Sequence, residues 1–291
     1  YKGALLEVPE ELILTSSKKG IINPLIYNPF IEKKAVTLSF DNAKRTNKTL
    51  TKVLPGGIKE SVMMTLESSD NKNLLLKYSL KGTPWNGKIM VPVTYALRIP
   101  GKPSDTPQFI LNKSDQVVDL YAHEPTNTHL LWQGPNDLSG KVWLSKNDSA
   151  LSIKVLVNDD THLQPHTSDK LYKGDGLQLG IQIPGQNGFW EFGFAQSEGG
   201  KPMTRIFRSP AGFEKNGVLH LKTNSTRNGL LYTIEIPLTT LRWNATSHNN
   251  LSFNILINDN DEGTRESWIV LTPGMGKTKN SDQFKRLIFN E

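Results

Sequence analysis

The sequence predicts an all-β protein made of two tandem antiparallel β-sandwiches. Apolar residues alternate with polar ones over short segments, and turn-forming residues separate those segments. Alternation with a period of two is typical of strands that bury one face, whereas helical periodicity is hard to find in this chain. The segment PGKPSDTP, residues 100–107, is rich in Pro, Gly and Ser and predicts a linker. We therefore expect one domain over residues 1–103 and a second over residues 104–291.

The first domain is predicted to be an immunoglobulin-like sandwich. Its alternating segments are KKAVTLSFDN (33–42), ESVMMTLES (60–68), NLLLKYSLKG (73–82) and KIMVPVTYALRIP (88–100). Short strands that recur at intervals of roughly 8–12 residues indicate a sandwich.

The second domain contains longer alternating segments. They are the predicted hairpin 140–160 and the segments 176–185, 188–196, 230–243 and 251–261. Half-buried antiparallel sheets produce this pattern, with one face in the core and one toward water. We expect Gln178 and Gln182 to point outward. Trp190 shares its face with two phenylalanines and is predicted to be core, whereas Trp143 is expected on an outer face.

Composition and charge exclude several classes of protein. The chain is 36% hydrophobic and 21% charged, as in folded globular proteins. Its net charge of +6, from 34 basic and 28 acidic residues, is spread along the chain, so no nucleic-acid partner is expected. With no cysteine there are no disulfides or thiolate metal sites. No apolar run approaches the ~18 residues of a membrane span. The opening YKGALLEVPEEL has neither a Met start nor a signal peptide, which predicts a processed or excised piece of a longer protein.

The stretch LVNDDTHLQPHTSDKLYKGDGLQLGIQI, residues 156–183, is the richest in chemically active side chains. A catalytic site is not favoured here, because Asp159 and Asp160 are adjacent at a strand end and point to opposite faces of an extended chain. No hydrolase, zinc-protease or phosphate-loop motif is present. We expect the stretch to be a strand-end loop in which Asp159, Asp160 and His162 line a pocket, and we expect that this chain is not an enzyme.

Two loops predict a calcium site. NDD (158–160) and NDNDEG (258–263) are dense in the hard oxygen ligands that Ca²⁺ prefers. The predicted ligands are Asp159, Asp259 and Asp261, and Ca²⁺ is the only cofactor that we expect. The alternative is that Asn, Asp and Gly simply form turns in these loops.

The six tryptophans could supply a surface on which sugar rings stack. Pyranose C–H faces lie on indole rings, while polar side chains bond the hydroxyls. The predicted ligand-binding residues are Trp132, Trp143, Trp268, Asp160, His162 and Arg265. The alternative for each tryptophan is packing in the core or at a sheet edge.

Four motifs occur in an order that resembles a known family. They are WQGPNDLSGKVWLSKNDSALSIKVLVNDDTHLQ, LYKGDGLQLGIQI, GLLYTIEIPLTTL and SFNILINDNDEGTRESWIVLTPG. Together they resemble the family 9 carbohydrate-binding module and its DOMON-like relatives, over about residues 109–291. The first third resembles a generic immunoglobulin-like bacterial module.

The resemblance implies a β-sandwich that binds sugars without catalysis, by aromatic stacking and in some members with structural calcium. It also implies that Asp175 and Glu235 have mainly structural roles. Such modules are usually attached to secreted polysaccharide-degrading enzymes. The leading hypothesis is therefore an accessory region of a larger secreted bacterial glycan-active protein, located extracellularly, at the cell surface or in the periplasm. Its partners would be a polysaccharide or oligosaccharide and a catalytic domain of the same or a partner chain. In the alternative hypothesis both sandwiches are spacers that pack on a catalytic domain without binding sugar.

Overall fold

The computed structural model describes residues 6–7, 12–15, 19–41, 49–67, 73–123, 126, 128–244 and 249–289. Strands dominate this part of the chain, and its only helices are short 3₁₀ turns. The chain divides into two compact units, Tyr1–Leu97 and Arg98–Glu291. The all-β prediction is confirmed.

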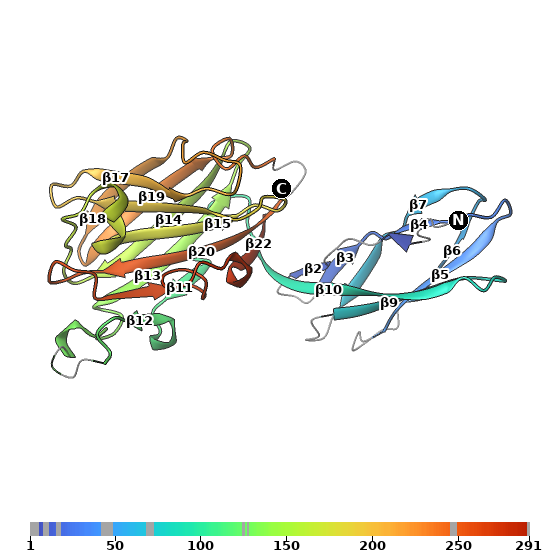
Figure 1. The fold of residues 1–291 in the computed structure, drawn as a ribbon, viewed down its shortest axis with the longest axis horizontal. Helices are drawn as coiled ribbons and strands as arrows, with labels where there is room; N and C mark the ends of the chain where they lie inside the picture. Colours follow the sequence, from blue (N-terminus) through green and yellow to red (C-terminus); the bar gives the residue numbers. More distant parts are fainter. Residues whose placement is uncertain are drawn as a thin grey trace. The chain divides into compact units, whose positions relative to one another are not determined.

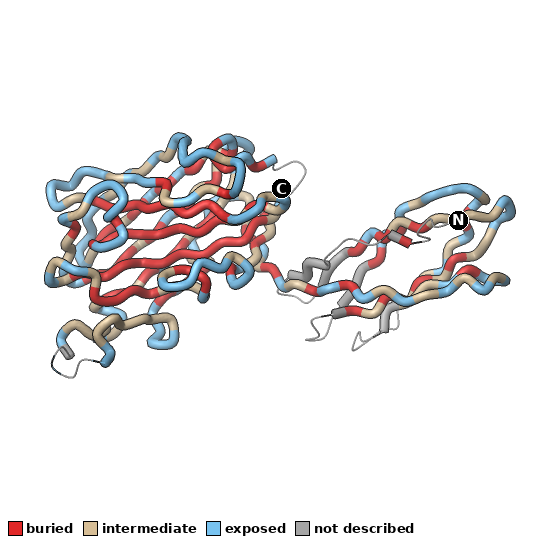
Figure 2. Tube along the Cα trace, in the orientation of Figure 1, coloured by how far each residue is buried: buried red, intermediate tan, exposed pale blue. Residues whose placement is uncertain are grey.

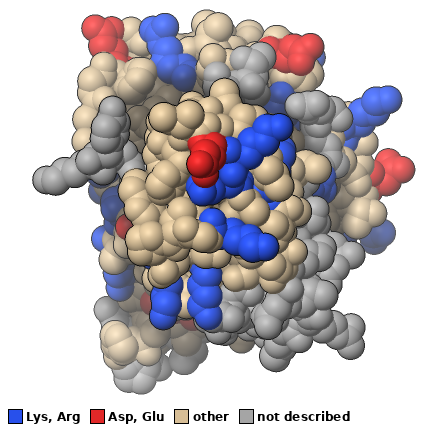
Figure 3. Space-filling view, turned by 90° about the vertical axis from the view of Figure 1, so that its right-hand side faces the viewer, with Lys and Arg blue, Asp and Glu red and all other residues tan. Residues whose placement is uncertain are grey.

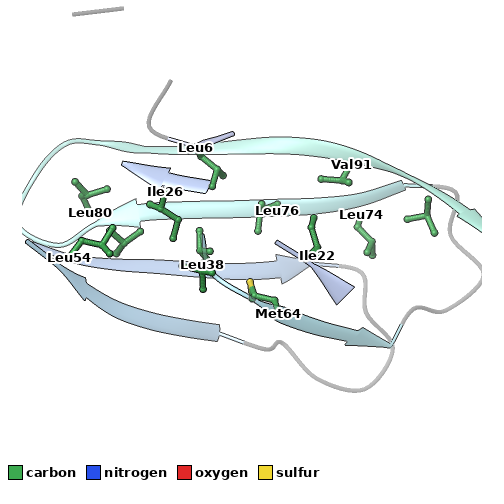
Figure 4. Packing of buried hydrophobic residues seen from close by; sticks show 13 residues of the cluster. Leu6, Ile22, Ile26, Leu38, Leu54, Met64, Leu74, Leu76, Leu80 and Val91 are labelled. Carbon is green, nitrogen blue, oxygen red and sulfur yellow. The ribbon is translucent and has the colours of Figure 1, made fainter. Parts of the chain in front are cut away.

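The first unit consists of small sheets around one core (Figure 1). Its strands are β1 (Leu6–Glu7), β2 (Leu12–Thr15), β3 (Lys19–Ile22), β4 (Leu25–Tyr27), β5 (Lys34–Asp41), β6 (Thr49–Leu54), β7 (Lys59–Ser61), β8 (Met64–Glu67), β9 (Asn73–Leu80) and β10 (Asn86–Ile99). Strands β10, β9, β5 and β6 form an antiparallel sheet, while β2 pairs with β10 in parallel. The alternation in β5 and β9 directs Leu38, Leu74 and Leu76 into the core drawn in Figure 4. The immunoglobulin-like identity of this unit stays a prediction.

The second unit is a sandwich of two antiparallel sheets. The first sheet contains β17 (Pro202–Arg208), β16 (Trp190–Gln196), β15 (Gly176–Gln182), β20 (Asn250–Asp259), β21 (Ser267–Val270), β22 (Lys285–Phe289) and β12 (Val117–Asp119). The second contains β11 (Phe109–Leu111), β13 (Leu138–Lys146), β14 (Ala150–Asp159), β19 (Gly229–Pro237) and β18 (His220–Thr226). Short 3₁₀ helices lie in the connections between strands: η1 (Ser114–Gln116), η2 (Thr128–Leu130), η3 (Ser168–Lys173) and η4 (Ser281–Gln283).

The core of this unit lies between the two sheets. Phe109 of β11 stacks on Phe253 of β20, with ring centroids 6.1 Å apart. Trp190 is buried beside Phe192, as predicted, and Trp143 is half-buried on the outer face of β13. Figure 2 shows that the strands of this unit are mostly buried while the connecting loops are mostly exposed.

The first sheet of this unit departs from the simple alternation. Gln178, predicted to face water, is only 4% exposed, because aromatic side chains cover the outer face of β15 and β16. Phe284 lies directly over Gly180, where an added Cβ would come within 2.6 Å of its ring, and Phe207 lies over Gly193 in the same way. Glycine at these two positions therefore lets a second apolar layer form outside the sandwich. Gln182, which is half-buried, follows the prediction more closely.

Charged side chains do not form one continuous stripe on the face drawn in Figure 3, where Lys and Arg occur in small groups among uncharged residues. Nucleic-acid binding proteins usually concentrate basic residues on one face or along one helix. Among the described residues, no helix is long and apolar enough to cross a membrane.

Candidate functional site

Strand register brings several acidic residues to one end of the second unit. Asp159 is the last residue of β14, Asp259 is the last residue of β20, and Asp175 immediately precedes β15. In the pairing of β15 with β20, Gly176 lies opposite Asn258, so the two sheet positions are neighbours. Each of the three aspartates follows the inward-facing alternation of its strand. The polar loops therefore converge where the apolar core ends.

The three residues predicted as metal ligands lie together at this end. Oxygen atoms of Asp159, Asp259 and Asp261 all lie within 4.8 Å of one another. Ligand atoms of Asp137, Asp160 and Asp261 also lie within 4.8 Å of one another. So do those of Asp159, His162 and Asp175. Glu266 adjoins these carboxylates, because its Oε1 accepts a hydrogen bond from the Asp261 amide. We call the whole group the carboxylate cluster: Asp137, Asp159, Asp160, Asp175, Asp259, Asp261 and Glu266.

Hydrogen bonds satisfy only part of this cluster. Asp259 Oδ2 accepts a bond from the Ser267 hydroxyl at 2.7 Å, and Glu266 Oε1 accepts one from the Asp261 amide at 2.8 Å. Asp175 Oδ2 accepts a bond from the Leu163 amide at 2.5 Å. In the described part of the chain, the second carboxylate oxygens of Asp175, Asp259 and Glu266 are buried without a donor. Buried acceptors of this kind normally have a partner.

Burial first, and mutual repulsion next, raise the pKa values of several of these carboxylates. Burial, and next the charge of Asp259, raise the pKa of Asp159 to about 8. Burial raises the pKa of Asp259 to about 7 and that of Glu266 to about 8. Burial likewise raises the pKa of Asp261 to about 6. A bound cation would remove this penalty, because it would neutralise the charges and satisfy the oxygens without donors. The donor set, nearly all carboxylate oxygen, fits Ca²⁺.

A polar cavity of about 550 Å³ opens beside the cluster. Asp159, Asp160 and His162 line it, as predicted. His162 is held in place by contacts of its ring nitrogens with the Gln196 carbonyl oxygen at 3.0 Å and with Asp175 Oδ2 at 3.5 Å. The remaining lining is mainly amide and hydroxyl groups, with Arg227 as the cation. Such a cavity can bond hydroxyl groups, but it offers no indole or phenyl ring.

Aromatic and cationic groups meet instead on the outer face of the first sheet. The Arg265 guanidinium lies 4.4 Å from the Trp268 ring centroid and 5.4 Å from that of Tyr172. Its Nη1 donates to Asn258 Oδ1 at 3.1 Å, and Gln178 Nε2 donates to the same oxygen at 3.0 Å. We call these five residues the outer-face stack. Burial lowers the pKa of Arg265, and the nearby Tyr172 opposes that shift.

The three tryptophans predicted to contact ligand occupy separate places. Trp268 is only 2% exposed and lies beneath Arg265, so a sugar cannot stack directly on it in this conformation. Trp143 lies on the other sheet, with Lys154 Nζ 5.3 Å from its ring centroid. Trp132 precedes β13, and its indole donates to the Leu138 carbonyl at 2.9 Å. They do not form one platform, and their roles as ligand contacts stay predictions.

Sequence reasoning did not assign Tyr172, Gln178 or Asn258 to a ligand surface, nor Asp137 and Glu266 to the metal site. Tyr172 lies on η3 within the polar stretch, where nothing local indicates that it approaches Arg265. Glu266 follows the predicted calcium loop directly, so its position in the sequence could have suggested it.

The second unit is thus a two-sheet sandwich with a carboxylate cluster at one end and an aromatic and cationic stack on one outer face. Residues 115–291, more than half of the chain, match the family described as carbohydrate family 9 binding domain-like, and the chain belongs to this family. The predicted resemblance is thereby confirmed.

The solved structures that are similar to this chain include the following three. Two are family 9 carbohydrate-binding modules from Caldicellulosiruptor kristjanssonii. The one in complex with cellotriose is 14% identical over 66% of this chain and 93% of that one, with a TM-score of 0.46. The one in complex with glucose is 14% identical over 66% and 95%, with a TM-score of 0.43. The third, from Bacteroides uniformis and described as carbohydrate-binding, is 9% identical over 62% and 86%, with a TM-score of 0.42. Among curated proteins, none matches the chain.

Proposed function

We propose that the second unit binds carbohydrate without catalysis, and that the outer-face stack is its ligand surface. The observation that carries this proposal is the Arg265 guanidinium between two aromatic rings, above the Asn258 and Gln178 amides. Tyr172, 36% exposed, presents a ring to a sugar C–H face. Arg265 supplies donors for hydroxyl groups, and the buried Trp268 fixes its position. Asp160 and His162 stay predicted ligand contacts in the neighbouring cavity.

The carboxylate cluster is proposed to hold structural Ca²⁺, with Asp159, Asp259 and Asp261 as ligands. Support comes from the mutual approach of their oxygens and from the buried oxygens that lack donors. A bound ion would supply positive charge where β14, β20 and the η3 loop end together. By binding one ion, Asp159, Asp259 and Asp261 would fix the positions of those loops relative to the outer-face stack.

The chain is further proposed to be an accessory region of a larger secreted bacterial glycan-active protein, acting outside the cytoplasm. Its partners would be a polysaccharide or oligosaccharide and a catalytic domain in the same or a partner chain. Binding would raise the effective concentration of the catalytic domain at its substrate, for which weak single-site affinity suffices. The competing proposal is a spacer that packs on a catalytic domain and binds no sugar.

A glycan-array screen of the whole chain, in Ca²⁺ and in chelator, separates these proposals. Binding confined to one polysaccharide class is expected. The absence of binding in both conditions, with the protein shown to be folded, would favour the spacer.

Tyr172→Ala is expected to weaken sugar binding by about tenfold or more, by analogy with aromatic side chains that stack on nucleic-acid bases, whose loss costs about 1–3 kcal/mol. The measurement is calorimetric titration with the best glycan from the array. Tyr95→Ala is the matched control, since Tyr95 has a similar exposure, 37%, and lies in the first unit. Equal affinities for both variants would remove Tyr172 from the ligand surface.

A further inference from the structure

A second cavity lies at the end of the sandwich opposite the carboxylate cluster. Along β15 the chain runs from Gly176, beside the cluster, to Ile181, which pairs with Trp190. Along β19 it runs from Gly229, opposite Asn158, to Pro237. The cavity begins where those strands finish and has a volume of about 690 Å³. This volume falls within the usual range for small-molecule sites, about 300–1,000 Å³. Its lining includes Trp190, Phe213, Glu214, Asn216, Thr240 and Arg242.

The walls of this cavity are held by specific bonds. Gln186 Nε2 donates to the Leu241 carbonyl at 2.8 Å, while Gln186 Oε1 accepts from the Trp190 indole at 3.0 Å. The Phe213 ring packs on Trp190 with centroids 5.9 Å apart. The Ser209 hydroxyl donates to the Phe213 carbonyl at 2.6 Å. The aromatic floor and the Arg242 turn are thus fixed relative to each other before any ligand arrives.

Arg242 occupies a position that suits glycine. Its φ is +50°, and the Trp243 and Arg242 amides donate to the Leu238 and Thr239 carbonyls at 3.0 and 3.2 Å. Residues 238–242 form a turn, and a left-handed residue in such a turn is usually Gly because a Cβ is disfavoured there. Among the described residues, only Arg242 and Ser168 combine a side chain with a positive φ. Strained residues of this kind occur often at ligand sites.

The groups around the cavity match the surface of a neutral sugar. Phe213 and Val218, which is 57% exposed, provide apolar surface for a C–H face. For the sugar hydroxyls, Arg242 offers hydrogen-bond donors, Glu214 offers acceptors, and Asn216 offers both. The charges of Arg242 and Glu214 cancel, so the rim carries no net charge. Asn216 and Glu214 are hydrogen-bonded to each other, which orients the acceptor side of the rim.

We propose that this cavity is a second saccharide-binding site, which takes a neutral pyranose residue. The choice of ligand class rests on the carbohydrate-binding function proposed above. The location does not, because the cavity shares no residue with the outer-face stack or the carboxylate cluster.

The test is an NMR titration of the whole chain with glucose, xylose, mannose, galactose and cellotriose. The Trp190 indole signal, identified with Trp190→Phe, and the Thr240 and Arg242 amides should shift saturably with at least one sugar. The same shifts should persist in Tyr172→Ala, which disables only the outer-face stack. Shifts confined to the neighbourhood of Tyr172 would overturn the second site and leave the proposed function standing. Shifts confined to the cavity would support the second site and would overturn the outer-face stack as the ligand surface.

Arg242→Gly provides the decisive variant. Affinity at the cavity should fall by about tenfold or more, since a hydrogen bond from a charged group is worth about 1.5–3 kcal/mol, while Tm should stay equal or rise because glycine suits the turn. Ser168→Gly relieves the same backbone conformation at the other end of the sandwich and should leave cavity binding unchanged. The second site is rejected if no sugar shifts the cavity signals, or if those shifts survive Arg242→Gly at unchanged affinity.

Discussion

Removal of calcium should destabilise the second unit, and the loss should be larger at pH 8 than at pH 5. An ion that binds only the folded state adds about 2.7 kcal/mol when it is present at a hundred times its Kd. Chelation removes that contribution and leaves the buried carboxylates without a counter-charge. The expected result is a lower Tm in chelator than in Ca²⁺, measured by calorimetry at both pH values.

The pH dependence follows from the direction of the pKa shifts. In the ion-free protein, the pKa of Asp159 is raised to about 8 and that of Asp259 to about 7, while unfolded aspartates titrate near 3.9. The folded state therefore retains protons that the unfolded state has released, so stability falls as pH rises from about 4 to 8. Each pH unit by which a pKa is displaced corresponds to about 1.4 kcal/mol, and because the sites repel one another their contributions are not additive.

Calcium should reverse this trend, because it binds the deprotonated carboxylates. Asp259→Asn should reduce both the calcium effect and the pH effect, whereas Asp282→Asn, at an exposed position on η4, should leave both unchanged. The comparison is made in chelator, between the unsubstituted protein and Asp259→Asn. If the unsubstituted protein loses no more stability between pH 5 and pH 8 than the variant does, the prediction is contradicted.

Trp268→Ala should destabilise the second unit by about 3–5 kcal/mol, the usual loss when a buried tryptophan is truncated. The indole is buried with Leu256, Met275 and Phe284, and Arg265 covers one face of it. The variant would leave a cavity under the outer-face stack. Urea denaturation followed by a probe in the second unit measures the effect.

Trp143→Ala is the matched control, since Trp143 is also on an outer face but is only half-buried. It should cost about 1 kcal/mol, because few packed neighbours are lost. Equal destabilisation by the two substitutions would mean that Trp268 is not part of a packed layer. Loss of sugar binding in Trp268→Ala would in any case combine misfolding with a missing contact, so Tyr172→Ala is the cleaner test of the ligand surface.

Strand alternation predicted most of the second unit. It correctly separated Val142 and Leu144 from Trp143, and it placed Trp190 in the core. It was wrong for Gln178, because side chains from other segments cover this face of the sheet: Phe207 lies over Gly193, which pairs with Gln178, and Phe284 lies over Gly180. Alternation of apolar and polar residues indicates which side chains share a face of a strand, but it does not indicate which other segments cover that face.

The candidate site shows the same limit. Asp159, Asp259 and Asp261 could be named from two oxygen-rich loops, because Asp and Asn at strand ends are visible locally. That Asp137 and Asp175 join them appears only in the folded chain, where the register of β15 with β20 sets the position of Asp175. Glu266 joins through the hydrogen bond that it accepts from the Asp261 amide.

The sequence by itself determined the all-β class, the faces of the strands, the family and the two calcium-type loops, since each depends on local pattern or on motif order. Only the tertiary structure decided that Trp268 lies beneath Arg265, that Tyr172 reaches the same guanidinium, and that a second cavity forms around Arg242. The contact of Tyr172 with Arg265 and the walls of the second cavity join residues far apart along the chain, whereas Arg265 and Trp268 are only three residues apart and meet because of how the chain folds there. Sheet register and loop packing bring them together, and neither leaves a periodic trace in the sequence.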